Sequence, residues 1–382
     1  MTADPYFATL SEALRVAEIH QPCLVLDLER LDRNVIAVES RLGDGLRLRI
    51  VDKSLPCVSL LSRIAGALGT TSFMSFHLPV SFAVLEAFPE AQLLVGKPMP
   101  VGGVRQALTR ADAARIVWLV DTDERLASYG ALAAESGLDL RLCFEVDVGL
   151  HRGGYANAAE LSRALERLRS LPRLHCEGIM GYEAHIGHVP RLLGGPKKAL
   201  ARARDAFRAF ASCLGPGERS ILNIAGSSTA LLYDRTTGAN EVSMGSAFVL
   251  PADFDVPSLA GLEPAAFIAT PILKVVDARV PGLDERSSFL QQLGLFPRRG
   301  CFLYGGKWMA EPVSPPGMKT NATIGFSTNQ QFMSLPNDTR AVAGDYAFLR
   351  PTQSEFVFQQ FGPIAVYSGG RIVDRWPVLV PA

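Results

Sequence analysis

Short hydrophobic runs alternate with helix-spaced hydrophobic positions along the chain up to Ser228. Residues 22–28 (PCLVLDL) read as a buried strand, and Leu31, Val35, Val38 and Leu42 then recur at helical spacing. Runs rich in branched or aromatic residues predict further strands at residues 46–51, 71–76, 92–96, 115–120, 138–146, 176–182 and 220–224. About eight strands that alternate with helices favour a (β/α)8 barrel over an open doubly wound sheet.

The pattern changes after about Leu250. Helical periodicity nearly disappears, and turns rich in Pro, Gly and Asn-Asp separate short β-like runs at residues 267–276, 301–304, 346–349, 356–358 and 364–367. We therefore predict an α/β protein with a TIM-like barrel over residues 22–250 and a mostly β C-terminal domain over residues 251–382. Residues 1–21 can join this second domain.

The charge balance excludes several classes of partner. Lys plus Arg equals Asp plus Glu, at 38 each, so no net field attracts nucleic acid or an anionic membrane. No apolar run is long enough to span a bilayer, and the N-terminal MTADP lacks a basic segment followed by an apolar one. A cytoplasmic protein is expected. The six cysteines show no CxxC spacing, which favours reduced thiols over a cysteine zinc site.

Lys53 is the first candidate for chemistry, because it follows the run at residues 46–51. In a barrel, catalytic residues collect where strands end. A lysine amine forms a reversible imine with an aldehyde, and partial burial can keep the amine neutral and nucleophilic. A solvated surface lysine is the alternative interpretation of this position taken alone.

Three later strand ends carry polar groups and glycines. Arg152 follows the sixth predicted strand, and Tyr182 and His185 follow the seventh. The eighth ends in Gly226-Ser227-Ser228, small residues suited to presenting backbone N–H groups to a phosphate, and Gly245-Ser246 can add to that cradle. The alternatives are ordinary turn glycines, a structural histidine and a surface ion pair of the arginine.

Taken in order, these segments resemble the fold-type III pyridoxal-phosphate enzymes, specifically the D-threonine aldolase and D-serine dehydratase family, with a barrel like the N-terminal domain of alanine racemase. The resemblance spans nearly the whole chain and rests on the ordered set. The matching segments are residues 22–27 (PCLVLD), 49–54 (RIVDKS), 146–154 (VDVGLHRGG), 181–185 (GYEAH), 226–228 (GSS), Glu241 with Gly245-Ser246, 344–345 (GD) and 370–377 (GRIVDRWP).

The resemblance implies a role for each candidate. Lys53 would hold pyridoxal 5'-phosphate through an imine and later act as a base. Arg152 would lie beside the pyridine nitrogen, Tyr182 would line the cofactor, and His185 would lie near the reacting bonds of the substrate. A head-to-tail homodimer is implied, in which the second domain completes the active site. The phosphate would be held by Gly226, Ser227, Ser228, Gly245 and Ser246.

The metal motif departs from the family pattern. The family reads Pro-x-His-x-Cys or Pro-x-His-x-Asp, whereas residues 351–355 read PTQSE, so Gln353 and Glu355 replace the ligands. Zinc is not expected, because neither sulfur nor imidazole remains at these positions. Two alternatives stay open: a Mg or Mn site of oxygen ligands, and loss of the metal. Residues 327–331 (STNQQ) and 50–52 (IVD) also differ from the family, so substrate handling is expected to differ.

The resemblance favours a pyridoxal-phosphate lyase that acts on a β-hydroxy-D-amino acid. Retro-aldol cleavage to glycine and an aldehyde is the first reading, because elimination of water depends more strongly on a Lewis acid at the hydroxyl. A D-serine or β-hydroxyamino acid dehydratase is the second reading, and an amino acid racemase the third. A non-catalytic pyridoxal-phosphate carrier is the last, since a carrier needs no second domain. The expected partner is a small amino acid.

Overall fold

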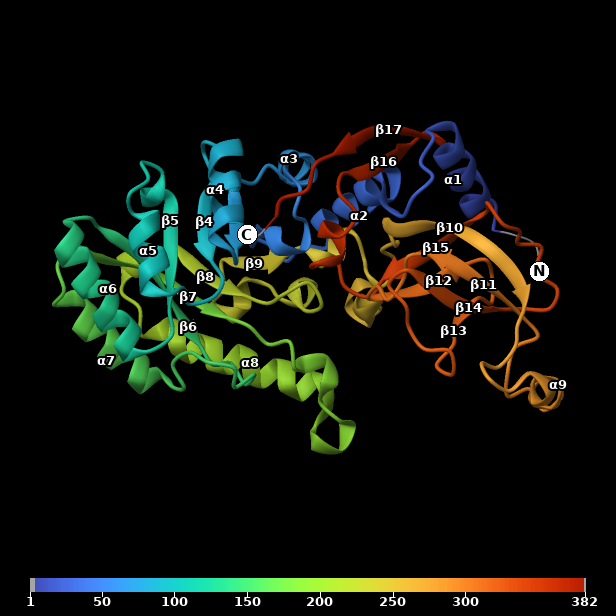
Figure 1. Cartoon of the computed structure of the whole chain (residues 1–382). Coiled ribbons are helices and arrows are strands. Elements are labelled where there is room, and N and C mark those ends of the chain that lie inside the picture. Colours follow the sequence, from blue (N-terminus) through green and yellow to red (C-terminus); the bar gives the residue numbers. More distant parts are fainter. Residues whose placement is uncertain (1–3, 381–382) are drawn as a thin grey trace. The chain divides into compact units, whose positions relative to one another are not determined.

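The computed structural model describes residues 4–380, without the side chains of residues 284–286. It divides the chain into two compact units (Figure 1). The barrel unit comprises residues 34–248 and 256–262 with the segment from Leu379. The β-rich unit comprises the described residues up to Arg33 with residues 249–255 and 263–378. Residues 1–3 and 381–382 of the expected second domain lie outside the described residues.

The barrel unit contains a closed barrel of eight strands, in the order in which they occur along the chain. Every neighbouring pair is parallel, and β2 closes the barrel against β9 with Arg47 opposite Glu241. The predicted (β/α)8 fold is therefore confirmed. The strands are β2 (Arg47–Val51), β3 (Ser72–Ser75), β4 (Gln92–Val95), β5 (Ile116–Val120), β6 (Leu140–Val146), β7 (Leu174–Gly181), β8 (Ile221–Ile224) and β9 (Glu241–Met244).

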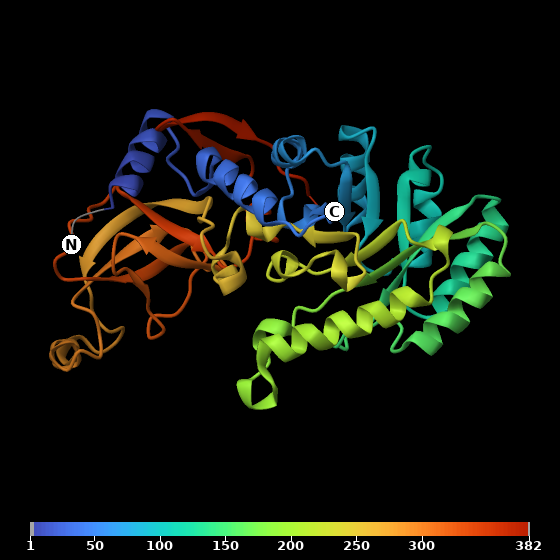
Figure 2. The same cartoon turned by 180° about the vertical axis from the view of Figure 1, so that it is seen from behind.

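Helices lie outside the barrel strands, and α8 is the long helix that runs along one side of them (Figure 2). Local sequence fixes where several begin and end: Thr122 caps α6 by accepting the Arg125 N–H, and Gly137 ends it in the left-handed conformation. The helices are α2 (Leu28–Arg41), α3 (Val58–Leu68), α4 (Leu78–Ala87), α5 (Val101–Ala107), α6 (Asp123–Ser136), α7 (Ala158–Arg169) and α8 (Gly195–Ser212).

One predicted barrel strand was assigned to the wrong sheet. Residues 22–28 form β1 (Cys23–Asp27), which pairs with β10 and β16 of the β-rich unit rather than with β2. All five residues of β1 are buried, and a fully buried strand followed by an amphipathic helix looks the same in either sheet. The eighth barrel strand is β9, which was missed because the polar residues Glu241 and Ser243, both buried, interrupt its hydrophobic pattern.

The β-rich unit is built on a nine-stranded sheet in which β1 lies between β10 and β16. Residues 356–358, predicted as a strand, instead enter a 3-10 turn because Phe356 has a left-handed φ of 64°. The elements are α1 (Pro5–Val16), β1, β10 (Ala266–Asp277), α9 (Asp284–Gln292), β11 (Arg299–Tyr304), β12 (Ala310–Ser314), β13 (Lys319–Thr320), β14 (Gln330–Leu335), β15 (Tyr346–Pro351), β16 (Ile364–Ser368) and β17 (Arg371–Trp376).

The two units have different interiors. Inside the barrel, apolar side chains such as Met74 and Leu119 form one cluster. A buried ion pair also lies within the barrel unit, between Arg49 Nε and Glu241 Oε1 at 2.6 Å, with both side chains 1% exposed. The core of the β-rich unit is rich in aromatic side chains, including Phe7, Phe267, Tyr346, Phe348 and Tyr367. None of the helices between residues 4 and 380 is long and apolar enough to cross a membrane.

Candidate active site

Lys53 lies directly after β2, in a single 3-10 turn over Asp52–Ser54. Its Nζ atom lies 4.5 Å from the ring centre of Phe76, which follows β3. The loop after β9 reaches the same place: a Cβ on Gly245 would lie 2.7 Å from the carbonyl oxygen of Val51. The glycine therefore allows the backbone of this loop to lie against the segment that carries the lysine.

Arg152 and Tyr182 form a second group, from the loops after β6 and β7. The Arg152 guanidinium lies 5.0 Å from the Tyr182 ring centre and donates a hydrogen bond of 3.0 Å to Glu145, at the end of β6. The Glu145 side chain is 9% exposed, while that of Arg152 is 50% exposed. Glu145 is not among the candidate residues predicted from the sequence. The structure shows that this carboxylate balances the charge of the arginine and fixes its direction.

The segments that are predicted to hold the phosphate lie in two loops that are hydrogen-bonded to each other. Ser227 Oγ, after β8, accepts the backbone N–H groups of Gly245 at 3.1 Å and Ala247 at 3.3 Å, both after β9. Ser246 is buried in the 3-10 turn Ser246–Phe248. A Cβ on Gly226 would lie 2.6 Å from Tyr182 Cε2, so the tyrosine ring rests on this glycine. The structure thus joins Tyr182, Gly226, Ser227 and Gly245.

His185 lies beside the loop after β6, since a Cβ on Gly149 would lie 3.2 Å from its Nε2. Asp147 organises that loop by accepting the N–H groups of Gly149 and His151 and by pairing with the His151 ring at 2.6 Å. Burial lowers the pKa of His185, and so does the nearby His151, while Asp147 opposes the shift. None of the residues 4–380 hydrogen-bonds to the buried Nδ1 of His185. The lowered pKa favours the neutral imidazole.

Glu183 is the main feature of the site that the sequence left without a role. It follows Tyr182 and is fully buried. Its carboxylate accepts a hydrogen bond of 2.5 Å from the Thr229 hydroxyl and one of 3.2 Å from the Ala225 N–H. A glutamate directly after a strand tip was visible in the sequence, but only the fold shows that it faces the interior.

The predicted metal residues belong to the β-rich unit. Gln353 Nε2 donates a hydrogen bond of 3.1 Å to Asp253 Oδ2, so its amide is already engaged. Within residues 4–380, no group of three or more His, Cys, Asp or Glu side chains is arranged to hold a metal ion. Gln353, Asp253 and Glu355 offer amide and carboxylate oxygens alone, and such ligands suit Mg or Mn better than zinc.

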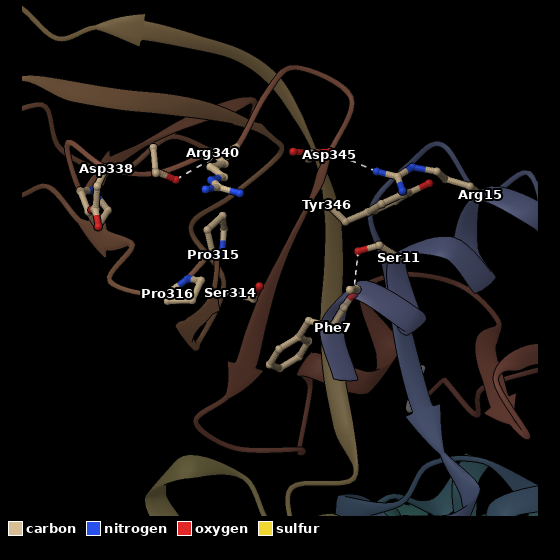
Figure 3. A pocket seen from close by; sticks show the side chains of 14 residues that line it. Phe7, Ser11, Arg15, Ser314, Pro315, Pro316, Asp338, Arg340, Asp345 and Tyr346 are labelled. Carbon is tan, nitrogen blue, oxygen red and sulfur yellow. Dashed lines mark hydrogen bonds and ion pairs between the residues drawn. The ribbon is translucent and has the colours of Figure 1, made fainter. Parts of the chain in front are cut away.

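The β-rich unit also contains a cavity of about 370 Å³ (Figure 3). Its walls come from α1, residues 314–316 and residues 336–346. Arg15 on one wall donates a hydrogen bond of 3.1 Å to Asp345. Asp338 and Arg340 also line it, so both signs of charge are present, and none of the described lining residues is a predicted site residue.

Comparison with known proteins identifies the barrel. The family model described as "Alanine racemase, N-terminal domain" matches residues 26–252. The chain belongs to this family. The match covers the barrel strands β2 to β9 and every strand end described above.

Two curated relatives of the chain are named as aldolases. A 3-hydroxy-D-aspartate aldolase of Paracoccus denitrificans (strain Pd 1222) is 27% identical over 256 residues, and a D-threonine aldolase of Arthrobacter sp is 24% identical over 258 residues. The matched region spans 62% of the first relative and 66% of the second, and equal shares of this chain.

Solved structures extend the likeness of the fold to both units. The D-threonine aldolase from Filomicrobium marinum superposes with a TM-score of 0.74 at 17% identity, over 94% of this chain and 96% of that one. An alanine racemase from Bacillus anthracis gives a TM-score of 0.70 at 16% identity, over 94% of this chain and 98% of that one. At these identities the likeness shows the fold alone.

The alanine racemase family implies pyridoxal phosphate, and the residues at the strand ends fit it. Lys53 offers an amine, and the loops of Gly226 and Gly245 consist of glycine and serine, which lets their backbone lie close to other groups. Ser227 already joins the two loops. Backbone N–H groups in such loops are suited to bind a phosphate.

Proposed function

We propose that the protein is a pyridoxal-phosphate-dependent lyase that cleaves a β-hydroxy-D-amino acid to glycine and an aldehyde. The observation that carries the proposal is the position of Lys53 at the end of β2, with the backbone of Gly245 against the same segment. Membership of the alanine racemase family and the names of the aldolase relatives support it.

Each group at the strand ends has a task in this proposal. Pyridoxal phosphate, when bound, withdraws electrons from the bond that breaks at the α-carbon of the substrate. Lys53 would hold the cofactor covalently, and the loops of Ser227 and Gly245 would bind its phosphate. Arg152, directed by Glu145, would lie beside the ring nitrogen, where a cation would disfavour protonation of the ring.

His185 would accept the proton of the substrate β-hydroxyl. Cleavage between Cα and Cβ requires removal of this proton, and a neutral imidazole can take it. Burial lowers the pKa of His185, which keeps the ring neutral at neutral pH, and its buried Nδ1 has no partner within residues 4–380. These two properties suit a base better than a structural histidine.

The residues at the metal position favour cleavage over elimination. Departure of hydroxide depends more strongly on a Lewis acid than removal of the hydroxyl proton does. Gln353 is a neutral amide, so its carbonyl oxygen would hold a cation more weakly than a charged ligand would. Elimination to a keto acid and ammonia is therefore the second reaction to test.

The proposal is tested by incubating the purified protein with D- and L-forms of β-hydroxy amino acids, including 3-hydroxyaspartate and threonine. Glycine, aldehyde and ammonia are assayed separately, with and without EDTA. We expect glycine and aldehyde in equal amounts from D-substrates. Ammonia with a keto acid would instead identify a dehydratase, and interconversion of D- and L-alanine without either product would identify a racemase.

We propose further that the chain acts as a homodimer with a small amino acid as its substrate, as the family resemblance implies. Sedimentation of the purified protein would test the assembly. A monomer that turns over the substrate would contradict a site shared between subunits.

A further inference from the structure

Two hydrogen bonds of the Glu183 carboxyl lead to one short loop. Oε1 accepts the Thr229 hydroxyl at 2.5 Å, and Oε2 accepts the Ala225 N–H at 3.2 Å. Ala225 and Thr229 are the two ends of the segment that follows β8, and between them lie Gly226, Ser227 and Ser228. One carboxyl therefore holds both ends of the loop that we assign to the cofactor phosphate.

The loop has a conformation that needs such support. Ala225 has a left-handed φ of 77°, a conformation that is unfavourable for a residue other than glycine. Within the loop, the Thr229 N–H donates to the Gly226 carbonyl at 3.0 Å, and the Gly226 N–H donates to Thr229 Oγ1 at 3.3 Å. Thr229 Oγ1 thus accepts a bond from the loop while it donates one to Glu183.

The surroundings of Glu183 make its burial costly. Besides the loop, the Tyr233 ring lies beside it, and Arg204 of α8 lies 5.4 Å from the centre of that ring. Burial raises the pKa of Glu183 to about 7, while its hydrogen bonds to Thr229 and Ala225 oppose the rise. Burial of a carboxyl in such an interior is unfavourable unless its hydrogen bonds compensate for the lost hydration.

We propose that Glu183 is a positioning residue for phosphate binding: it holds the loop of Gly226, Ser227 and Ser228 in the shape that receives the cofactor phosphate. The inference rests on the proposed function, because it takes pyridoxal phosphate as the ligand. Glu183 also follows Tyr182, whose ring packs on Gly226, so one segment after β7 supports the loop both by hydrogen bonds and by contact.

The test compares two aldehydes that differ by the phosphate. Apoprotein of the full chain is titrated with pyridoxal 5'-phosphate and with pyridoxal, and binding is followed by absorbance and protein fluorescence. In Glu183→Gln, the amide cannot accept from both the Ala225 N–H and the Thr229 hydroxyl in the same way. We expect about a tenfold loss of affinity for pyridoxal phosphate, as for one lost bond to a charged group, and an unchanged affinity for pyridoxal.

Two variants of Thr229 keep the test valid if Glu183→Gln folds poorly. Thr229→Val removes the hydroxyl and should give the same selective loss, whereas Thr229→Ser keeps it and should restore the affinity. Glu177→Gln is the matched control, because Glu177 is on the same strand β7 but pairs with Arg141 at 2.8 Å. Its affinity for both aldehydes should equal that of the wild type.

Two results would overturn the inference. If Glu183→Gln and Thr229→Val bind pyridoxal phosphate as tightly as the wild type, the loop does not depend on Glu183. If they lose equal affinity for both aldehydes, the role is general to the fold and not directed to phosphate. A wild-type protein that binds no pyridoxal phosphate would refute the proposed function and this inference together, so the two failures are distinguishable.

Discussion

The interiors of the barrel unit and the β-rich unit are built from different chemistry. In the barrel unit, buried Arg49 and Glu241 form an ion pair, and Asn223 Nδ2 donates to Glu241 at 2.9 Å. In the β-rich unit, aromatic rings pack on one another, with Phe7 5.3 Å from Phe267 and 4.9 Å from Phe348 between ring centres. The barrel unit thus adds directional polar bonds to its apolar cluster, whereas the other core depends on shape and apolar area.

This difference indicates which of the two units is more sensitive to substitutions. Directional bonds hold loops in fixed positions, and the proposed chemistry lies on loops at strand ends of the barrel unit. The β-rich unit also buries one carboxylate, Asp27, but it lies at the end of β1 beside Arg30, with the Tyr6 hydroxyl donating to it at 2.9 Å. We expect changes inside the barrel unit to affect function and stability together.

The largest effect is expected from Lys53→Ala, which separates chemistry from folding. The purified wild-type protein should be yellow, because Lys53 binds the cofactor covalently, and the variant should lose both the visible absorbance band and turnover. Its unfolding curve should match that of the cofactor-free wild type. Lys97→Ala, a lysine after β4, is the control and should stay yellow. A colourless wild type that gains no band with added cofactor contradicts the assignment.

His185→Gln tests whether the neutral imidazole is a base. We expect turnover to fall by about 10²–10⁴-fold, the usual contribution of a positioned acid–base group, while the cofactor band and its intensity persist. Steady-state assay of glycine release and an absorbance spectrum of the same sample measure the two quantities. Unchanged turnover would contradict the role of His185 as a base and would indicate a structural role instead.

Arg49→Ala tests the directional interior of the barrel unit. Removal of one partner leaves Glu241 buried without its cation, so the free energy of unfolding should fall by about 3–5 kcal/mol. Unfolding in urea measures the loss. The double variant Arg49→Met with Glu241→Gln should recover much of it, because no lone buried charge remains. A loss below about 1 kcal/mol in Arg49→Ala would show that the pair adds little.

The pH dependence of the free energy of unfolding is expected to reveal the raised pKa of Glu183. Its carboxyl has a pKa of about 7 in the folded chain and the ordinary 4.5 in the unfolded chain. Between these values the folded chain holds one proton more, so the free energy of unfolding falls as pH rises, by about 3 kcal/mol in all. Urea unfolding of the apoprotein from pH 4.5 to 8 should show a flatter curve for Glu183→Gln. Parallel curves would contradict the shift.

The smallest effect is expected from the β-rich unit, at Gln353 and Glu355. With one ionic ligand replaced by an amide, a bound cation should be held at least about tenfold more weakly than by a complete site. EDTA should then remove it quickly, and Mg or Mn should restore activity better than zinc. Full activity after EDTA, with no metal found by elemental analysis, would assign Gln353 and Glu355 to direct contact with the substrate.

The sequence predicted the barrel better than it predicted the sheet. Seven barrel strands have hydrophobic runs that are bounded by turns, and the structure confirms strands at these places. The β1 strand was misplaced because burial of all five residues does not tell one sheet from another. Partners of β1 lie far along the chain, and no local pattern specifies such pairing.

The candidate site was predictable where a residue follows a strand, as with Lys53, Arg152 and Tyr182. Contacts between loops were not predictable, because they depend on which strand ends become neighbours. Two such contacts are the hydrogen bond from the Gly245 N–H to Ser227 Oγ and the hydrogen bond from the Ala225 N–H to the Glu183 carboxyl. Gln353 was visible as a departure from the family motif, but its bond to Asp253 was not.

The place of β1 in the sheet has a consequence for synthesis of the chain. Its neighbour β16 is synthesised long after it, and the Ser368 hydroxyl bonds to Glu29, 339 residues away. At usual ribosomal rates, β1 must wait on the order of 15–70 s for this partner. During that interval the barrel strands can close, while the apolar residues of β1 stay open to chaperones or to aggregation. Ribosome-bound chains that end before Ile364 should therefore expose β1 to proteolysis.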